Sequence, residues 1–505
     1  MESYKLKISY TALIIINIFL INQINCYVKL ALGYLPNENY RFIQDNNQLE
    51  SEEQIMKQLY FSKLITYFEI GTPSQSQMLF LDSERKDFYL DSYNPAHNAQ
   101  EEYKLSKFYK FEGKDYYNES LSQSYIQGKS EYYYNLEIDE FTEYHSKDKL
   151  KLNLNGNMVF IEDFPIKIIK DHIESVPGLI GLSMNKTFPK EAQSFLYQLK
   201  SKNLIKDFYW FFDFDEFSPL NRKIKGELII GDLPHNIFPQ KYSKENYYQF
   251  TSCIYTTFWT ISIDEIYIDN IDKDYQFINT DISLFYDFYP AIGPRHFLNS
   301  IKKNFLQELI DANKCFNGTF SQNIYFSIYS ADDLIFYYCE KSVQNILYEN
   351  LPSIKFIKND FTFELNKEEL FYIKGDYIYF MVLFLKDYHI TENINHNYNF
   401  FVGQIFTSKY HFVFHTDTGR ISYYKKVNII NEEDETNKND NVEGKDNKKI
   451  WTFIVSTALV FVVIGIIIGI VIGIKFIKKR RAKRAEELVD EDYDYTPKNE
   501  NNVVN

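Results

Sequence analysis

The chain has 505 residues, of which 45% are hydrophobic and 18% aromatic, so it can build a large folded core and is not a disordered protein. Its formal net charge is −14, and its one dense basic cluster runs from Lys475 to Arg484. A nucleic-acid partner is not expected, because neutralising phosphates requires a clustered basic face on the folded protein.

Residues 1–26 have the order of a signal peptide. Lysines come first, an apolar stretch follows, and small or polar residues end the segment. A buried strand or a retained anchor is the alternative interpretation. Residues 27–60 are polar and form either a short pro-segment or an extra N-terminal strand.

The middle of the chain, from about 61 to 425, has the pattern of many short strands. Runs of β-branched and aromatic residues are broken there by Gly, Pro, Asn and Asp. Helices are expected from Pro189 to Lys202 and from Pro294 to Asn313, each after a proline that can open a helix. This pattern predicts an all-β fold with two lobes, at 61–245 and 246–425.

The C-terminal part carries a membrane anchor. Residues 426–449 are too polar to bury a core and form a stalk. Trp451 to Ile474 are 24 uncharged residues, enough to cross a bilayer core of ~30 Å, so 450–474 is predicted to be a single transmembrane helix. Basic residues open the tail 475–505, which places that tail in the cytosol.

The predicted topology is therefore a single-pass type I membrane protein with most of the chain outside the cytosol. The secretory pathway, the cell surface and an endosomal or vacuolar membrane are all compatible with it. Within the span, three glycines at four-residue spacing share one helix face and would let a second copy approach closely: Gly465, Gly469 and Gly473. A homodimer is one interpretation, and the general frequency of glycine in membrane helices is the other.

Four cysteines and three glycosylation sequons fit an oxidising lumen. Cys26 is expected to leave with the signal peptide, and the remaining three thiols cannot all pair within one chain. Cys315 and Cys339 flank a segment of hairpin length and are the expected disulfide. The candidate N-glycosylation sites are Asn118, Asn185 and Asn317.

Several motifs for other chemistries are absent from the sequence. It has no Gly-x-Ser-x-Gly elbow, no His-Glu-x-x-His, no Cys-x-x-Cys and no glycine-rich phosphate loop, and its nine histidines are scattered singly. No metal site and no cofactor are expected.

One stretch carries a specific pattern of carboxylates. Ile70-Gly-Thr-Pro-Ser-Gln is followed by an apolar run and then by Asp82-Ser83-Glu84, with eleven residues from Gly71 to Asp82. It resembles the opening hairpin of the pepsin family of aspartic proteases, in which the same turn precedes an Asp-Thr/Ser-Gly triplet at that spacing.

The resemblance continues in order over most of the chain outside the two ends. Ser124-Tyr125-Ile-Gln-Gly is similar to the family's flap hairpin, whose tyrosine overhangs the cleft. The further matching segments are Val176 to Ser183, Phe195 to Phe211, Gly226 to Asp232, Phe258 to Ile261 and Phe401 to Phe414. The resemblance implies a bilobal pepsin-like acid protease fold, in which Asp82 is the first catalytic residue and Tyr125 the flap tyrosine.

The second catalytic position is degenerate in the alignment that the resemblance suggests. The family's Asp-Thr-Gly-Thr-Ser-Leu pattern aligns with Asn279-Thr280-Asp281-Ile282-Ser283, so that Asn279 stands in place of the aspartate. A register shifted by two residues would instead place Asp281 there. Because an amide does not exchange a proton in this pH range, losing the carboxyl typically costs about 10² to 10⁴ in rate.

Both glycines of the triplets are also replaced, by Glu84 and by Asp281. A side chain at these positions crowds the turn that glycine would leave open. A literal Asp417-Thr418-Gly419 is predicted to be an ordinary hairpin turn.

The sequence therefore favours a pepsin-like protein that is catalytically impaired or inactive and binds a peptide or protein in the cleft between its lobes. The alternative is an active acid endopeptidase that uses Asp82 and Asp281. The family relation alone would imply the second of these.

Overall fold

The structure is a computed structural model. It describes the following residues: 26–35, 51–60, 62–83, 85, 87–92, 115–135, 139–170, 176–184, 194–218, 223–251, 258–268, 277–326, 329–351, 353–359, 361–386 and 400–425.

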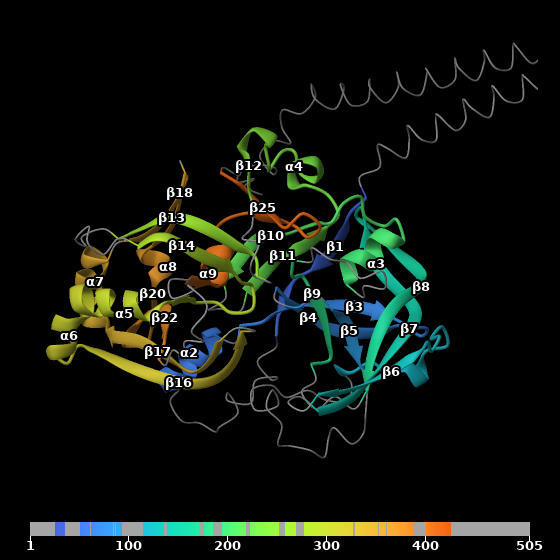
Figure 1. Cartoon of the computed structure of the whole chain (residues 1–505), viewed down its shortest axis with the longest axis horizontal. Helices are drawn as coiled ribbons and strands as arrows, with labels where there is room; N and C mark the ends of the chain where they lie inside the picture. Colours follow the sequence, from blue (N-terminus) through green and yellow to red (C-terminus); the bar gives the residue numbers. More distant parts are fainter. Residues whose placement is uncertain are drawn as a thin grey trace, which may run out of the picture. The chain divides into compact units, whose positions relative to one another are not determined.

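Strands make up most of the described chain and helices are few and short, so the predicted all-β class is confirmed (Figure 1). The strands follow the period-two pattern of their sequences. In β3 (Leu64–Ile70), for example, Tyr67 and Glu69 face solvent while Phe68 and Ile70 are buried.

The first sheet has 14 strands, and most of them come from the first half of the chain. Its hydrogen-bonded order is β12-β25-β24-β10-β11-β1-β7-β8-β5-β9-β4-β3-β2, with β6 paired to β7. Besides β3, its strands are β1 (Val28–Ala31), β2 (Gly33–Tyr34), β4 (Gln75–Asp82), β5 (Phe88–Asp91), β6 (Ser130–Asn135), β7 (Asp139–Leu154), β8 (Asn157–Lys170), β9 (Gly178–Gly181), β10 (Tyr209–Ser218), β11 (Lys223–Ile230), β12 (Tyr247–Thr251), β24 (Phe412–His415) and β25 (Arg420–Tyr424).

The second sheet has 11 strands, all from the second half of the chain. Its order is β19-β18-β13-β14-β23-β15-β22-β17-β21-β20, with β16 paired to β17. Its strands are β13 (Thr260–Ile268), β14 (Phe277–Leu284), β15 (Ala291–Gly293), β16 (Cys315–Phe326), β17 (Tyr329–Glu340), β18 (Ser353–Lys358), β19 (Phe361–Asn366), β20 (Phe371–Lys374), β21 (Tyr377–Phe380), β22 (Val382–Leu385) and β23 (Phe400–Val402).

The described helices are short. They are α2 (Glu52–Tyr60), α3 (Phe195–Ser201), α4 (Pro234–Ile237), α5 (Arg295–Ile301), the π-helical turn η10 (Lys302–Leu306), α6 (Gln307–Asp311), α7 (Gln344–Asn350), α8 (Lys367–Leu370) and α9 (Gln404–Thr407), with 3₁₀ turns η6 (Glu119–Leu121), η8 (Lys244–Asn246) and η11 (Lys341–Val343).

Both helices expected from the sequence are present. The helix expected after Pro294 is the run α5, η10 and α6, and Pro294 is its N-cap. The other is shorter than expected, because Ser194 caps α3 by accepting a hydrogen bond from the backbone N–H of Tyr197.

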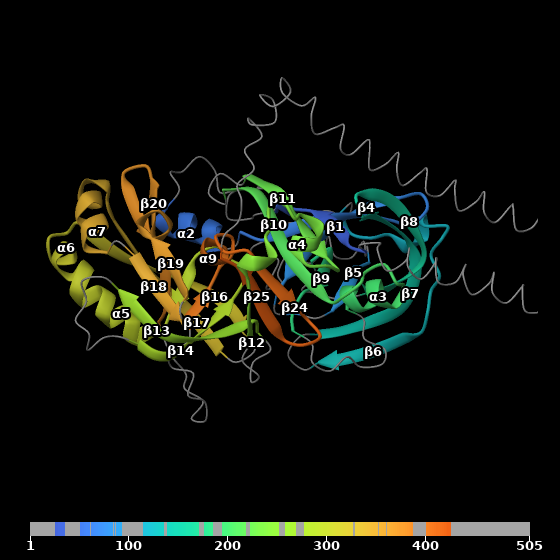
Figure 2. The ribbon, with the colours of Figure 1, turned by 90° about the horizontal axis from the view of Figure 1, so that it is seen from above.

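The polar segment 27–60 contributes to both sheets. Strand β1 pairs antiparallel with β11 and with β7, so the segment supplies an N-terminal strand, one of the two interpretations of its sequence. Helix α2 packs against β16 in the second sheet, where the Tyr60 ring lies 5.9 Å from that of Phe320, and Met56 of the helix is buried as well. Figures 1 and 2 both show α2 beside the strands of the second sheet, although it precedes β3 in the chain. The buried apolar face of α2 was not foreseen in a segment that is polar on average.

Two tryptophans lie where the sheets meet. Trp259, at the start of β13, donates its indole N–H to the carbonyl of Leu182 at 2.8 Å, and both side chains are buried. Its ring lies 6.0 Å from that of Trp210 in β10. A buried hydrogen bond therefore joins residues that are 77 positions apart in the chain.

None of the helices in the described residues has the length and apolar character needed to cross a membrane. The predicted transmembrane helix 450–474, the stalk 426–449 and the tail 475–505 lie outside the described residues, as do residues 1–25 of the predicted signal peptide.

Candidate functional site

Asp82 lies at the end of β4, where the chain leaves the first sheet. The apolar run Met78 to Leu81 before it is buried in the core. Strand β4 pairs in parallel with β9, where Asp82 is opposite Gly181, and the backbone carbonyl of Asp82 accepts a hydrogen bond from the N–H of Leu182 at 2.7 Å. The Asp82 side chain is half-buried at this strand end.

The carboxylate of Asp82 interacts with its own turn. Its Oδ1 accepts a hydrogen bond from the backbone N–H of Arg85 at 2.8 Å, and its Oδ2 lies 3.6 Å from the Arg85 Nε. Such a contact is typical of an aspartate that closes a turn. Glu84, the residue expected at the first glycine position, lies outside the described residues.

The second sheet repeats the strand arrangement that surrounds Asp82. In the first sheet β4 pairs in parallel with β9, which pairs antiparallel with β5. In the second sheet β14 pairs in parallel with β23, which pairs antiparallel with β15. The two sets of three strands can therefore be compared residue by residue.

This comparison identifies Phe285 as the counterpart of Asp82. Leu81 is opposite Ile180 in the first sheet, and Leu284 is opposite Val402 in the second, so the residues that follow Leu81 and Leu284 are equivalent. The backbone of Phe285 donates to the carbonyl of Val402 at 2.9 Å.

A second pair of hydrogen bonds gives the same equivalence. The N–H of Gly181 donates to the carbonyl of Asp87, and the N–H of Gly403 donates to the carbonyl of Pro290. Asp87 and Pro290 each lie five residues after Asp82 and Phe285, respectively (87 − 82 and 290 − 285). Asp82 and Phe285 are therefore equivalent both by the strand before them and by the segment after them.

This register differs from the one inferred from the sequence. Asn279 precedes Phe285 by six residues (285 − 279) and Asp281 precedes it by four (285 − 281), and both lie inside β14. Thr280 is buried, and the buried Ser283 hydroxyl lies 3.0 Å from the Thr260 hydroxyl in β13.

The alignment on Thr280 and Ser283 was wrong because it followed the polar residues of the segment. The strand pairing instead makes Phe285, which directly follows β14, the equivalent of Asp82. Neither Asn279 nor Asp281 stands at this equivalent position.

Phe285 is an integral part of the core. Its side chain is 1% exposed. Its ring centroid lies 5.3 Å from Phe258, 5.3 Å from Phe288 and 5.8 Å from Phe401. An aromatic cluster thus occupies the place where the second carboxylate of a symmetric pair would stand.

A carboxylate that the sequence analysis missed does approach Asp82. Asp287, two residues after Phe285, is buried, and its Oδ2 accepts hydrogen bonds from the backbone N–H of Ser83 at 3.3 Å and from the Ser83 hydroxyl. Its Oδ1 lies 3.9 Å from the Nζ of Lys63. The signal available in the sequence was a single charged residue inside the aromatic run Phe285-Tyr-Asp-Phe-Tyr289.

The surroundings of Asp287 change its acidity. Burial and the negative charge of Asp82 raise the pKa of Asp287 to about 6, although Lys63 and the hydrogen bonds from Ser83 act in the opposite direction. This carboxyl therefore titrates between neutral and mildly acidic pH.

The predicted flap tyrosine is held against β7. The hydroxyl of Tyr125 lies 2.9 Å from the hydroxyl of Ser146, and Ile126 forms an isolated antiparallel bridge with Lys147. Nearby, the buried carboxylate of Asp148 accepts hydrogen bonds from Ser124 at 2.6 Å and from the Tyr117 hydroxyl. The segment that carries Tyr125 is therefore tied to β7 by side chains as well as by its backbone.

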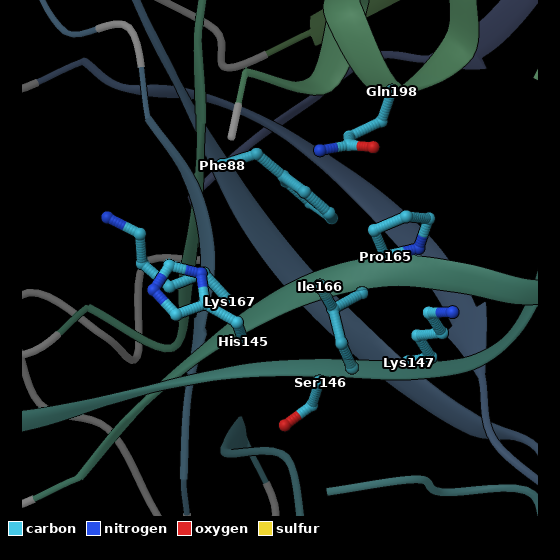
Figure 3. A pocket seen from close by; sticks show the side chains of 8 residues that line it. All are labelled: Phe88, His145, Ser146, Lys147, Pro165, Ile166, Lys167 and Gln198. Atoms are coloured by element: carbon cyan, nitrogen blue, oxygen red, sulfur yellow. The ribbon is translucent and has the colours of Figure 1, made fainter. Parts of the chain in front are cut away.

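A pocket of about 180 Å³ lies beside this segment (Figure 3). Its walls come from β5, β7, β8 and α3, and the residues that line it are Phe88, His145, Ser146, Lys147, Pro165, Ile166, Lys167 and Gln198. The Lys167 ammonium lies 2.9 Å from Glu143 and 3.4 Å from Asp87. Figure 3 shows the Ser146 side chain pointing away from Phe88 and Gln198, which agrees with its contact to Tyr125.

The predicted disulfide and two of the predicted glycosylation sites lie within the described residues. Cys315 and Cys339 form the expected disulfide, which joins directly paired residues of β16 and β17. Asn317 is exposed on β16, and Asn118 is half-buried at the N-cap of η6, where its side chain accepts a hydrogen bond from the N–H of Ser120. Asn185 and the glycines at 465, 469 and 473 lie outside the described residues.

The hairpin turn predicted for Asp417 to Gly419 is confirmed. It connects β24 and β25, Gly419 has a φ of +62°, and its N–H donates to the carbonyl of His415 at 2.9 Å. Among the described residues, no three His, Cys, Asp or Glu side chains gather closely enough to hold a metal ion.

The two sheets offer different chemical groups at the positions of Asp82 and Phe285. Each half of a two-aspartate site must offer a carboxylate to one shared water, one protonated and one ionised. Here Asp82 is held by Arg85 and Asp287 by Ser83, and the position equivalent to Asp82 carries the apolar ring of Phe285.

No known family model matches this chain, and none of the curated proteins matches it significantly.

Proposed function

We propose that this protein is a membrane-anchored homologue of the pepsin-like aspartic proteases that binds peptides or proteins and has lost, or nearly lost, the ability to cleave them. The proposal combines the ordered sequence resemblance with the two β-sheets and their repeated strand arrangement. In this interpretation the two sheets are the two lobes of the bilobal fold, and residues 450–474 anchor them to the membrane.

The observation that carries the loss of activity is the position of Phe285. Peptide hydrolysis by this family requires a carboxyl from each lobe, because one must polarise the substrate carbonyl while the other takes a proton from water. A phenylalanine can do neither. Losing one acid/base group typically costs about 10² to 10⁴ in rate.

A specific observation supports the second candidate, an active acid endopeptidase. Asp287 is a buried carboxyl, its pKa is raised to about 6, and the charge of Asp82 contributes to that shift. An active form would therefore use Asp82 with Asp287, in place of the pair Asp82 and Asp281 suggested by the sequence. The bonds of Asp287 to Ser83 argue against this candidate, since Oδ2 already accepts two hydrogen bonds from Ser83.

Peptide cleavage by the purified full chain tests the proposal. The chain is incubated with a fluorogenic peptide library between pH 3 and 7, beside the Asp82→Ala and Asp287→Asn variants. We expect no turnover above that of Asp82→Ala at any pH. Turnover that both substitutions abolish, and that a transition-state inhibitor of aspartic proteases blocks, would instead establish the second candidate.

Binding is measured on the same samples. A non-hydrolysable statine-type peptide is titrated into the full chain by calorimetry, with a scrambled peptide lacking statine as the control. Saturable binding of the statine peptide alone supports a retained cleft. Absence of binding across a panel of such peptides would contradict the binding function.

A further inference from the structure

The contact between Ser83 and Asp287 joins the two sheets through a titratable group. Ser83 follows β4 of the first sheet, and Asp287 follows β14 of the second. Besides the two bonds that Ser83 donates to Asp287, the backbone N–H of Tyr286 donates to the Ser83 hydroxyl at 3.5 Å. All three residues are at most 5% exposed, so water does not compete for these bonds.

A neighbouring contact joins Tyr286, next to Asp287, to the residues before β3 without a titratable group. The amide of Gln404 donates one hydrogen bond to the carbonyl of Ser62 at 2.6 Å and another to the carbonyl of Tyr286 at 2.7 Å. Gln404 cannot gain or lose a proton in the physiological range. Changes of pH therefore act on the Ser83–Asp287 contact and leave the Gln404 contact unaltered.

Three charged side chains face the Ser83–Asp287 contact or lie directly behind it. Lys63, which precedes β3, lies 3.9 Å from Asp287 and favours its ionised form. Asp82 opposes that form, and Arg85 lies 3.6 Å from Asp82 and offsets part of its charge. Burial is the largest influence and also opposes ionisation.

We propose that the Ser83–Asp287 contact is a latch between the two sheets that tightens in acid and loosens at neutral pH. The direction follows from linkage. The closed, buried state binds a proton on Asp287 more tightly than an open state in which that carboxyl reaches water, so protonation favours closure.

The change in the ratio of closed to open protein depends on how much the proton affinity of Asp287 differs between the two states. The pKa of Asp287 is about 6 in the closed state and 3.8 for an ordinary aspartate. A difference of about two pKa units corresponds to about a 60-fold change in the ratio of closed to open protein between neutral pH and pH 4, where an ordinary aspartate is already partly protonated. A protein that moves from the cell surface to an acidic compartment would experience most of this change.

Hydrogen exchange of the full chain at pH 4 and pH 7.5 tests the latch, with rates corrected for the intrinsic pH dependence of amide exchange. We expect segments 79–83 and 283–289 to be up to about 60-fold more protected at pH 4. Asp287→Asn is expected to remove this difference. Asp281→Asn, a control on the same strand-to-turn segment, is expected to keep it.

Equal protection of wild type at both pH values, or an unchanged difference in Asp287→Asn, would overturn the proposal. Should Asp287→Asn fail to fold, Lys63→Met provides an independent test. Because Lys63 favours the ionised carboxylate, its loss is expected to move the midpoint of the protection change to higher pH. A midpoint that stays in place or moves to lower pH would also count against the latch.

Discussion

Phe285 takes in the second sheet the place that Asp82 takes in the first. The two residues follow Leu284 and Leu81, which pair with equivalent residues of β23 and β9. One position carries a half-buried carboxylate at a turn, and the other carries a buried ring in an aromatic cluster. At equivalent backbone positions, Asp82 is therefore partly exposed to solvent, whereas Phe285 is part of the buried core.

This difference predicts a large loss of stability for a substitution at Phe285 and a small one at Asp82. Phe285→Ala removes a fully buried ring and should lower the free energy of unfolding by about 3–5 kcal/mol. Asp82→Asn keeps an acceptor for the Arg85 N–H and loses only a partly exposed ion pair, so it should cost at most about 1 kcal/mol. Urea denaturation of the two variants measures both values, and similar losses would contradict the assignment.

Helix α2 is expected to be a permanent part of the fold. Met56 of α2 is 0% exposed, so Met56→Ala should cost about 2–5 kcal/mol. The control is Glu53→Ala on the same helix, which removes an exposed pair with Lys57 and should cost less than about 0.5 kcal/mol.

Thermal unfolding of both α2 variants separates this interpretation from a removable pro-segment. If residues 27–60 were dispensable, Met56→Ala would be as stable as Glu53→Ala. N-terminal sequencing of the protein isolated from its natural membrane provides an independent measurement, and we expect the mature chain to retain α2.

Acid stability should depend on His415. Burial lowers the pKa of His415 to about 4, and its Nε2 lies 2.7 Å from the Ser422 hydroxyl and 3.1 Å from the Tyr247 hydroxyl. Since the folded state binds this proton less tightly than the unfolded state, the stability associated with His415 is complete above pH 6.5 and is lost as the pH falls towards 4.

The magnitude is about 3 kcal/mol for a shift of about 2.5 pKa units in this buried side chain. His415→Gln keeps a hydrogen-bonding group and removes the titration. Its free energy of unfolding should therefore fall less steeply between pH 6.5 and 4 than that of the wild type. Parallel pH profiles would show that His415 does not titrate between these limits.

The titration of Asp287 makes stability depend on pH in the direction opposite to that of His415. The folded state binds its proton more tightly, so its contribution is largest below pH 4 and is lost as the pH rises through about 6. Asp287→Asn and His415→Gln should consequently change the pH profile with opposite signs. Because the two contributions are of similar size and opposite sign, they largely cancel in the wild type, so the profile of the double variant should stay close to that of the wild type.

The disulfide is expected to stabilise the protein by lowering the conformational entropy of the unfolded chain. Cys315 and Cys339 are 24 residues apart, and closing a loop of that size is worth about 3 kcal/mol in the chain-entropy model. Replacing both cysteines by serine should lower the free energy of unfolding by about 2–4 kcal/mol. Equal stability of the oxidised and reduced wild type would contradict this expectation.

The sequence alone determined the local features of this protein. Alternating apolar and aromatic runs predicted an all-β chain, Pro294 marked the start of a helix, and the spacing of Cys315 and Cys339 matched a hairpin. The Asp417 to Gly419 turn was likewise predictable. Each of these features depends on residues close in sequence, where backbone preferences and side-chain periodicity are sufficient.

Only the tertiary structure decided which residue of the second sheet takes the place that Asp82 has in the first. The polar pattern around Asn279 and Asp281 suggested one register, while pairing of β14 with β23, more than 100 residues later, places Phe285 there and brings Asp287 to Ser83. Register between distant strands depends on which side chains fill the shared core. The raised pKa of Asp287 likewise follows from its burial and from Asp82, which lies about 200 residues away in the chain.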